Sequence, residues 1–124
     1  MSKPNNVHGT GLVLGEIGVL LRGPSGAGKS VLALSLLDRW SDRGQSAFLV
    51  SDDRVDLSAQ ADIVTMQAPP NLGGLIELRG RGIVRRPQQG EARLHLVIDL
   101  VDDLARMLEE LELAAGTVKG GSKE

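Results

Sequence analysis

The chain has 124 residues, 41% of them hydrophobic and 24% charged, with a formal net charge of −2. This size and composition predict a single globular domain with a modest core. The net negative charge argues against a basic surface for nucleic acid. The lack of cysteine excludes disulfides and thiolate metal sites. No apolar run is long enough for a membrane span or for the core of a signal peptide. We therefore expect a cytoplasmic protein with no nucleic-acid or membrane partner.

Short apolar runs alternate with turn residues along the first half of the chain. Residues 1–6 are polar, and we expect them to form a flexible N-terminus. Strands are predicted at 10–14 and 19–22, joined by a hairpin connection at 15–18. A helix is predicted from Lys29 to about Arg43, with Gly44 as its stop. Its apolar stripe consists of Ala33, Leu36, Leu37 and Trp40. Residues 47–50 then predict a buried strand.

The second half of the chain is rich in strand candidates. Alternating apolar residues at 55–59 and a run at 63–66 predict a pair of strands. Shorter strand candidates lie at 75–78, 83–84 and 94–98, and residues 88–91 predict an exposed loop. A second helix is predicted at 102–113, with Leu104, Met107, Leu108 and Leu111 as its buried stripe, and 114–124 is predicted to be a disordered tail.

Residues 23–30 carry the pattern G-x-x-x-x-G-K-S between a predicted strand and a predicted helix. They are Gly23, Pro24, Ser25, Gly26, Ala27, Gly28, Lys29 and Ser30. Glycines let several backbone N–H groups point at one phosphate, the lysine can reach the β- and γ-phosphates, and the serine hydroxyl can bind Mg²⁺. The N-terminal end of the helix favours the same anion. The pattern therefore predicts a phosphate-binding loop for a phosphorylated nucleotide, with ATP, GTP and pyrophosphate all open.

Two predicted strands end in aspartate, and phosphoryl transfer needs a carboxylate near the metal and a group that takes the acceptor's proton. The adjacent carboxylates of Asp52 and Asp53 repel each other unless a cation or a proton lies near, which favours a site. Neighbouring side chains at a strand end point in opposite directions, so we expect different roles for the two. The alternative is a solvated turn neutralised by Arg54. For Asp99 we favour a cap of the following helix.

A cationic stretch lies beside Glu77 and allows two interpretations. It contains Arg79, Arg81, Arg85 and Arg86. Either Glu77 binds metal while the arginines hold phosphates, or the stretch is a solvated strand whose charges prevent edge pairing. His8 alone would most often be a surface histidine.

Four strings, in this order, resemble the HPr kinase/phosphorylase family. They are His8-Gly9-Thr10, the loop at 23–30, Leu49-Val50-Ser51-Asp52-Asp53, and residues 75–83, LIELRGRGI. The last is similar to a signature of that family, L-E-V-R-G-x-G-I, which unrelated nucleotide-binding proteins lack. The resemblance covers about residues 7–108 and only the C-terminal catalytic domain, in a short form similar to the α-proteobacterial branch.

The resemblance implies an ATP-dependent kinase that phosphorylates a serine of HPr, the carrier protein of the phosphotransferase system, or of an HPr paralogue. It also implies the reverse reaction, in which inorganic phosphate attacks phosphoserine and pyrophosphate leaves. By position, Asp53 would be the base and Lys29 would stabilise the transferring phosphoryl group. His8 would lie beside the phosphate pocket, and Arg106 is a weak match to a later family arginine. The implied Mg²⁺ site consists of Ser30, Glu77 and Asp52.

The fold implied by the resemblance is α/β, a mixed β-sheet similar to phosphoenolpyruvate carboxykinase rather than a doubly wound sheet, over residues 7–113. Hexamers are usual in the family, which continues beyond Leu113 into a helix used in phosphorolysis and subunit contacts. Here a polar tail follows, so both properties stay open. Two alternatives remain: a small-molecule kinase whose metal-side carboxylate is Asp99, and a nucleotide-binding regulatory module with lost or weak catalysis.

Overall fold

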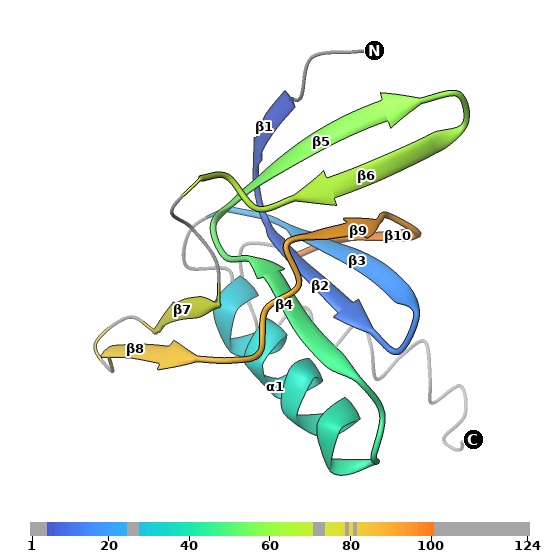
Figure 1. The fold of residues 1–124 in the computed structure, drawn as a ribbon. Coiled ribbons are helices and arrows are strands. Elements are labelled where there is room, and N and C mark those ends of the chain that lie inside the picture. Colours follow the sequence, from blue (N-terminus) through green and yellow to red (C-terminus); the bar gives the residue numbers. More distant parts are fainter. Residues whose placement is uncertain (1–4, 25–27, 71–73, 79, 81, 101–124) are drawn as a thin grey trace, which may run out of the picture.

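The computed structural model describes residues 5–24, 28–70, 74–78, 80 and 82–100. One helix and ten strands lie in these ranges (Figure 1). In chain order they are β1 (Asn5–His8), β2 (Thr10–Leu14), β3 (Ile17–Arg22), α1 (Lys29–Asp42), β4 (Ala47–Ser51), β5 (Arg54–Gln60), β6 (Ile63–Gln67), β7 (Leu75–Leu78), β8 (Gly82–Arg85), β9 (Glu91–Arg93) and β10 (Leu96–Asp99).

The central sheet has the strand order β10-β3-β2-β4. β2 pairs antiparallel with both β3 and β4, whereas β10 pairs parallel with β3. The sheet is therefore mixed, as predicted. The expected hairpin is also present, but its connection is shorter than 15–18, because Ile17 and Gly18 already belong to β3 and Leu14 lies opposite Ile17.

Both faces of β2, inside the central sheet, are buried, which explains why none of its five residues is charged. Alternate side chains of a strand point to opposite faces. Leu12 and Leu14 accordingly pack with Ala33 and Leu37 of α1. Val13 and Leu20 instead pack with Val55 and Met66 of the second sheet. The central sheet thus lies between α1 and the second sheet (Figure 1).

The helix α1 matches its predicted bounds within one residue. Ala33 and Leu37 of the predicted stripe are buried, and Leu36 and Trp40 are partly buried against the same core. Gly44 follows the helix at φ +77°, a left-handed conformation that glycine adopts without steric penalty, and its N–H donates to the carbonyl of Ser41.

The second sheet, β1-β5-β6-β9, is antiparallel throughout. Two predictions are wrong in and beside its outer strands. Asn5 and Asn6 belong to β1 and pair with β5, so the ordered sheet begins inside the segment 1–6 that we expected to be flexible. In the segment 88–91, Gln88 forms a bridge with Leu49 and Glu91 begins β9, so this segment is not simply a loop. Polar residues pair here with distant strands, and local sequence patterns do not report such pairing.

A separate hairpin, β7–β8, lies beside α1 (Figure 1). Ile76 is fully buried and joins the core formed by α1 and the central sheet. Arg86 follows β8 and makes a bidentate ion pair with Asp38 of α1, at 2.9 and 3.1 Å. Leu78 is partly buried against the same core, so apolar packing and an ion pair together hold the hairpin to α1.

Replacing Ile76 by Ala is expected to lower the free energy of unfolding by about 2–5 kcal/mol, since it removes fully buried methyl groups and leaves a cavity. Ile83, in the same hairpin, is 66% exposed. Ile83→Ala is therefore the matched control, with an expected change within about 0.5 kcal/mol. Urea unfolding of the two variants measures the difference, and equal losses would contradict the packing described here.

In the part of the chain that the structure describes, no helix has the length and apolar character needed to cross a membrane. The predicted helix at 102–113, which contains Arg106, and the predicted tail at 114–124 lie outside the described residues.

Candidate active site

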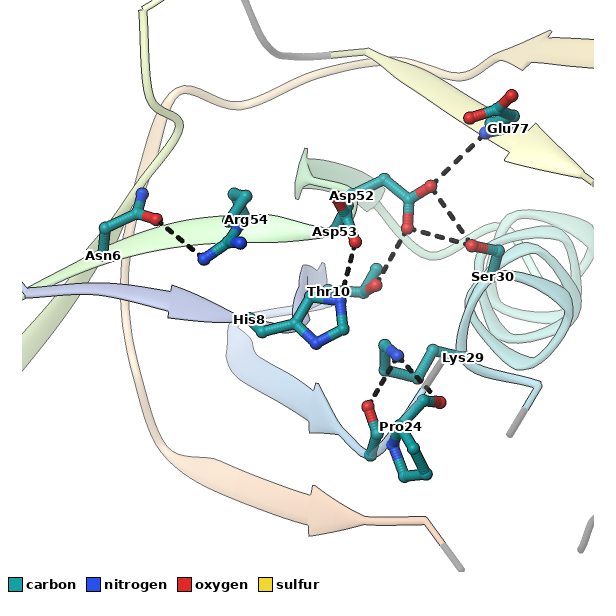
Figure 2. Close-up of polar contacts among 11 residues, drawn as sticks. Asn6, His8, Thr10, Pro24, Lys29, Ser30, Asp52, Asp53, Arg54 and Glu77 are labelled. Carbon is teal, nitrogen blue, oxygen red and sulfur yellow. Dashed lines mark hydrogen bonds and ion pairs between the residues drawn. The ribbon is translucent and has the colours of Figure 1, made fainter. Parts of the chain in front are cut away.

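The predicted phosphate-binding loop lies between β3 and α1, as expected from its pattern. β3 ends at Arg22 and α1 begins at Lys29; Ser25, Gly26 and Ala27 lie outside the described residues. The Lys29 ammonium donates hydrogen bonds to the carbonyls of Gly23 (2.7 Å) and Pro24 (3.2 Å), and the residue is only 8% exposed (Figure 2). The Lys29 ammonium is therefore held by the backbone carbonyls of the first two residues of its own loop.

Asp52 receives hydrogen bonds from three different elements (Figure 2). The Thr10 hydroxyl of β2 donates to Oδ1 at 2.9 Å. The Ser30 hydroxyl of α1 lies 3.1 Å from Oδ1 and 3.2 Å from Oδ2. The backbone N–H of Glu77 in β7 lies 3.3 Å from Oδ2. One carboxylate thus joins the start of α1, the start of β2 and the β7–β8 hairpin.

Asp53 points to a different partner, as the sequence predicted for two adjacent carboxylates. Its Oδ1 lies 2.8 Å from Nε2 of His8, and its carbonyl accepts the N–H of Gly9 at 2.9 Å. Its backbone has φ +74°, a left-handed conformation that costs on the order of 1 kcal/mol or more outside glycine and is often found at functional sites. The turn between β4 and β5 is thus held in a strained form that separates the two carboxylates.

The Asp53 side chain is 68% exposed and that of His8 is 38% exposed. A carboxylate that is accessible on one side and hydrogen-bonded on the other can accept a proton from a substrate while keeping its orientation. His8 can supply the orienting hydrogen bond from Nε2. Asp53 directly follows Asp52, which in turn contacts Ser30 at the start of α1 (Figure 2).

The three residues predicted to hold Mg²⁺ are brought together, but not in the expected way. Ser30 and Asp52 contact each other through side-chain oxygens, whereas Glu77 touches Asp52 through its backbone N–H. Among the described residues, no three acidic, histidine or cysteine side chains gather into a metal cluster. Oxygen donors suit Mg²⁺, which usually binds one or two carboxylates together with substrate phosphates. The donor set fits such a shared site.

Asp99 and Arg86 take part in other interactions. Arg22 forms a bidentate ion pair with Asp99 at the ends of β3 and β10, with distances of 2.7 and 3.0 Å. The hydrogen bond from Arg22 lowers the pKa of the Asp99 carboxyl, and the same contact raises the pKa of Arg22. Asp99 therefore has Arg22 on both oxygens, and Arg86 is paired with Asp38. Arg79 and Arg81 lie outside the described residues.

Thr10 is the site residue that the sequence did not single out. It belongs to the string His8-Gly9-Thr10, but no role followed from its type alone. The structure buries it completely and points its hydroxyl at Asp52. A polar residue at the head of an otherwise apolar strand was the only local signal.

Known proteins resemble both the sequence and the fold. The family described as HPr Serine kinase C-terminal domain matches residues 1–113. The HPr kinase/phosphorylase of Lactobacillus acidophilus is 36% identical over 110 residues, which cover 82% of this chain and 32% of that protein. The HPr kinase/phosphorylase of Bordetella pertussis is 38% identical over 109 residues, covering 82% and 33% of the two chains.

A solved structure gives the same picture. The Hpr(Ser) kinase/phosphatase from Coxiella burnetii matches with a TM-score of 0.64 and 31% sequence identity, over 77% of this chain and 58% of that one. The chain spans about one third of the length of the curated relatives named above. The match over residues 1–113 and the shared fold lead to one conclusion: the chain belongs to the HPr Serine kinase C-terminal domain family.

Proposed function

We propose that this chain is a cytoplasmic kinase that transfers a phosphoryl group from ATP to a serine of an HPr-type carrier protein. The names of its relatives support the acceptor. The observation that carries the proposal is the arrangement of two adjacent carboxylates beside the loop. Asp52 contacts Ser30 at the start of α1, and Asp53 contacts His8 at 2.8 Å.

The described side chains fit three tasks in this reaction. Lys29 exchanges its contacts with the loop carbonyls for the phosphate oxygens of ATP, where its charge stabilises the transferring group. Ser30 and Asp52 would provide oxygen ligands for Mg²⁺, and the Glu77 carboxylate would join them only by turning toward Asp52, which Glu77 now contacts through its backbone N–H. When bound, Mg²⁺ neutralises charge on the β- and γ-phosphate oxygens.

Asp53 is the proposed base. The serine oxygen of the acceptor forms a bond to the γ-phosphorus, and the bond from that phosphorus to the β–γ bridging oxygen breaks, so that ADP leaves with the electron pair. The serine proton passes to Asp53 while His8 holds the carboxylate in place. In the reverse direction an oxygen of inorganic phosphate forms a bond to the phosphorus of phosphoserine, and the bond from that phosphorus to the serine oxygen breaks. Protonated Asp53 gives its proton to the departing serine oxygen, and pyrophosphate is the product.

The test is incubation of the purified chain with ATP labelled in the γ-phosphate, Mg²⁺ and a purified HPr-type protein. We expect the label on one serine of the acceptor, located by mass spectrometry, and no label when that serine is replaced by Ala. Nucleotide binding without transfer to any HPr-type protein would contradict the proposal and would favour a regulatory module.

A further inference from the structure

Three consecutive residues, His8 to Thr10, hold the two consecutive aspartates of the β4–β5 turn. The His8 ring contacts the Asp53 carboxylate, the Gly9 N–H donates to the Asp53 carbonyl, and the Thr10 hydroxyl donates to the Asp52 carboxylate. The first two contacts fix the strained residue. Only the third fixes Asp52 from the side of the central sheet.

We propose that Thr10 is a positioning residue for Asp52, which it holds toward Ser30 so that both oxygen donors face one cation. This role rests on the proposed function, because it concerns the Mg²⁺ site of that reaction. Thr10 does not itself reach substrate in this arrangement, and it acts through Asp52.

Burial explains why the hydroxyl of Thr10 matters more than its shape. The residue is 0% exposed, and its hydroxyl lies 2.9 Å from Asp52 Oδ1. A buried hydroxyl needs a partner, and a hydrogen bond to a carboxylate is stronger than one between neutral groups. Thr10 therefore limits rotation of the Asp52 carboxylate from β2. Ser30 contacts the same carboxylate from α1, and the Glu77 N–H contacts it from β7.

Partners that orient a ligating carboxylate typically change metal affinity by about 10–100-fold when they are removed. Thr10→Val keeps the branched shape and removes the hydroxyl, whereas Thr10→Ser keeps the hydroxyl and removes a methyl group. A role in orienting Asp52 predicts that Val is the harmful change, and a role in packing predicts that Ser is. The two roles are thus distinguished by which of the two variants loses more metal affinity.

The measurement is the affinity for Mn²⁺, used as a paramagnetic probe in the presence of pyrophosphate and followed by electron paramagnetic resonance. We expect Thr10→Val to weaken Mn²⁺ binding by about tenfold and Thr10→Ser to stay within about twofold of the wild type. On an Asp52→Asn background, Thr10→Val should cause no further loss, because its effect acts through that carboxylate. Should Thr10→Val not fold, comparison of Thr10→Ser with Thr10→Ala isolates the hydroxyl in the same way.

Equal Mn²⁺ affinity for Thr10→Val and the wild type would overturn the proposal, and so would a wild-type protein that binds no Mn²⁺ with pyrophosphate. In either case serine phosphorylation of an HPr-type protein can still be observed, and the proposed function then stands without this role for Thr10. Conversely, the expected Mn²⁺ pattern without any phosphoryl transfer would support Thr10 as a positioning residue and contradict the kinase.

Discussion

Asp53→Asn is expected to lower the rate of serine phosphorylation by about 10²–10⁴-fold, the usual contribution of a general base. The amide keeps the size of the side chain and its contact with His8, but it cannot accept the serine proton. Single-turnover transfer of labelled phosphate from ATP to the acceptor measures the loss. Nucleotide affinity should change little, because the Asp53 side chain contacts His8 and not the residues of the phosphate-binding loop that the structure describes.

Asp99→Asn is the matched control for this experiment. Asp99 is the last residue of β10 in the central sheet, but both of its oxygens contact Arg22. We expect transfer by Asp99→Asn to stay near the wild-type rate. Transfer that survives in Asp53→Asn and is lost in Asp99→Asn would contradict the proposed base and would indicate Asp99 as the carboxylate that the reaction needs.

Gly18→Ala is expected to destabilise the fold by at least about 3 kcal/mol, and so to lower the melting temperature by about 10 °C or more. A Cβ at this position would lie 1.8 Å from the Arg93 carbonyl oxygen and 3.2 Å from Met66 Cε. The obstacle is backbone, so a rotamer change cannot relieve it. Moving the backbone of β3 away from Arg93 would also break the two hydrogen bonds between Gly18 and His95, at 2.8 and 3.0 Å.

Gly90→Ala provides the comparison, since a Cβ there would meet nothing within 4 Å. Its melting temperature should match that of the wild type within a few degrees. A Gly18→Ala protein as stable as Gly90→Ala would contradict the close approach of β3 to Arg93 at the end of β9.

Local patterns in the sequence predict the elements that bury an apolar face. β2, β3 and β4 are short apolar runs bounded by turn residues, and α1 has an apolar stripe at helical spacing that includes Ala33 and Leu37. The outer strands β1 and β9 cannot be predicted in this way, because neither contains a fully buried residue. Asn5, Asn6 and Glu91 have no apolar period, and backbone pairing with β5 and β6 makes them strands.

The site shows a similar division. Ser30, Asp52 and Asp53 follow from the loop pattern and from two adjacent carboxylates after a buried strand. The resemblance to a kinase family adds His8, which its residue type alone did not mark. Two further features depend on contacts across the sheets and leave no pattern in the sequence. These are the Thr10 hydroxyl bond to Asp52 and the use of the Glu77 N–H rather than its carboxylate.

The central claim is that Ser30, Asp52 and Asp53 form one phosphoryl-transfer site with the loop before α1. A crystal structure with Mg²⁺ and a non-hydrolysable ATP analogue tests it most directly. We expect Lys29 on the phosphates, the Ser30 hydroxyl about 2.0–2.1 Å from Mg²⁺, and Asp53 facing the γ-phosphate. Phosphates bound away from this loop, or Mg²⁺ bound by Asp99 with Asp52 and Asp53 remote from it, would contradict the account.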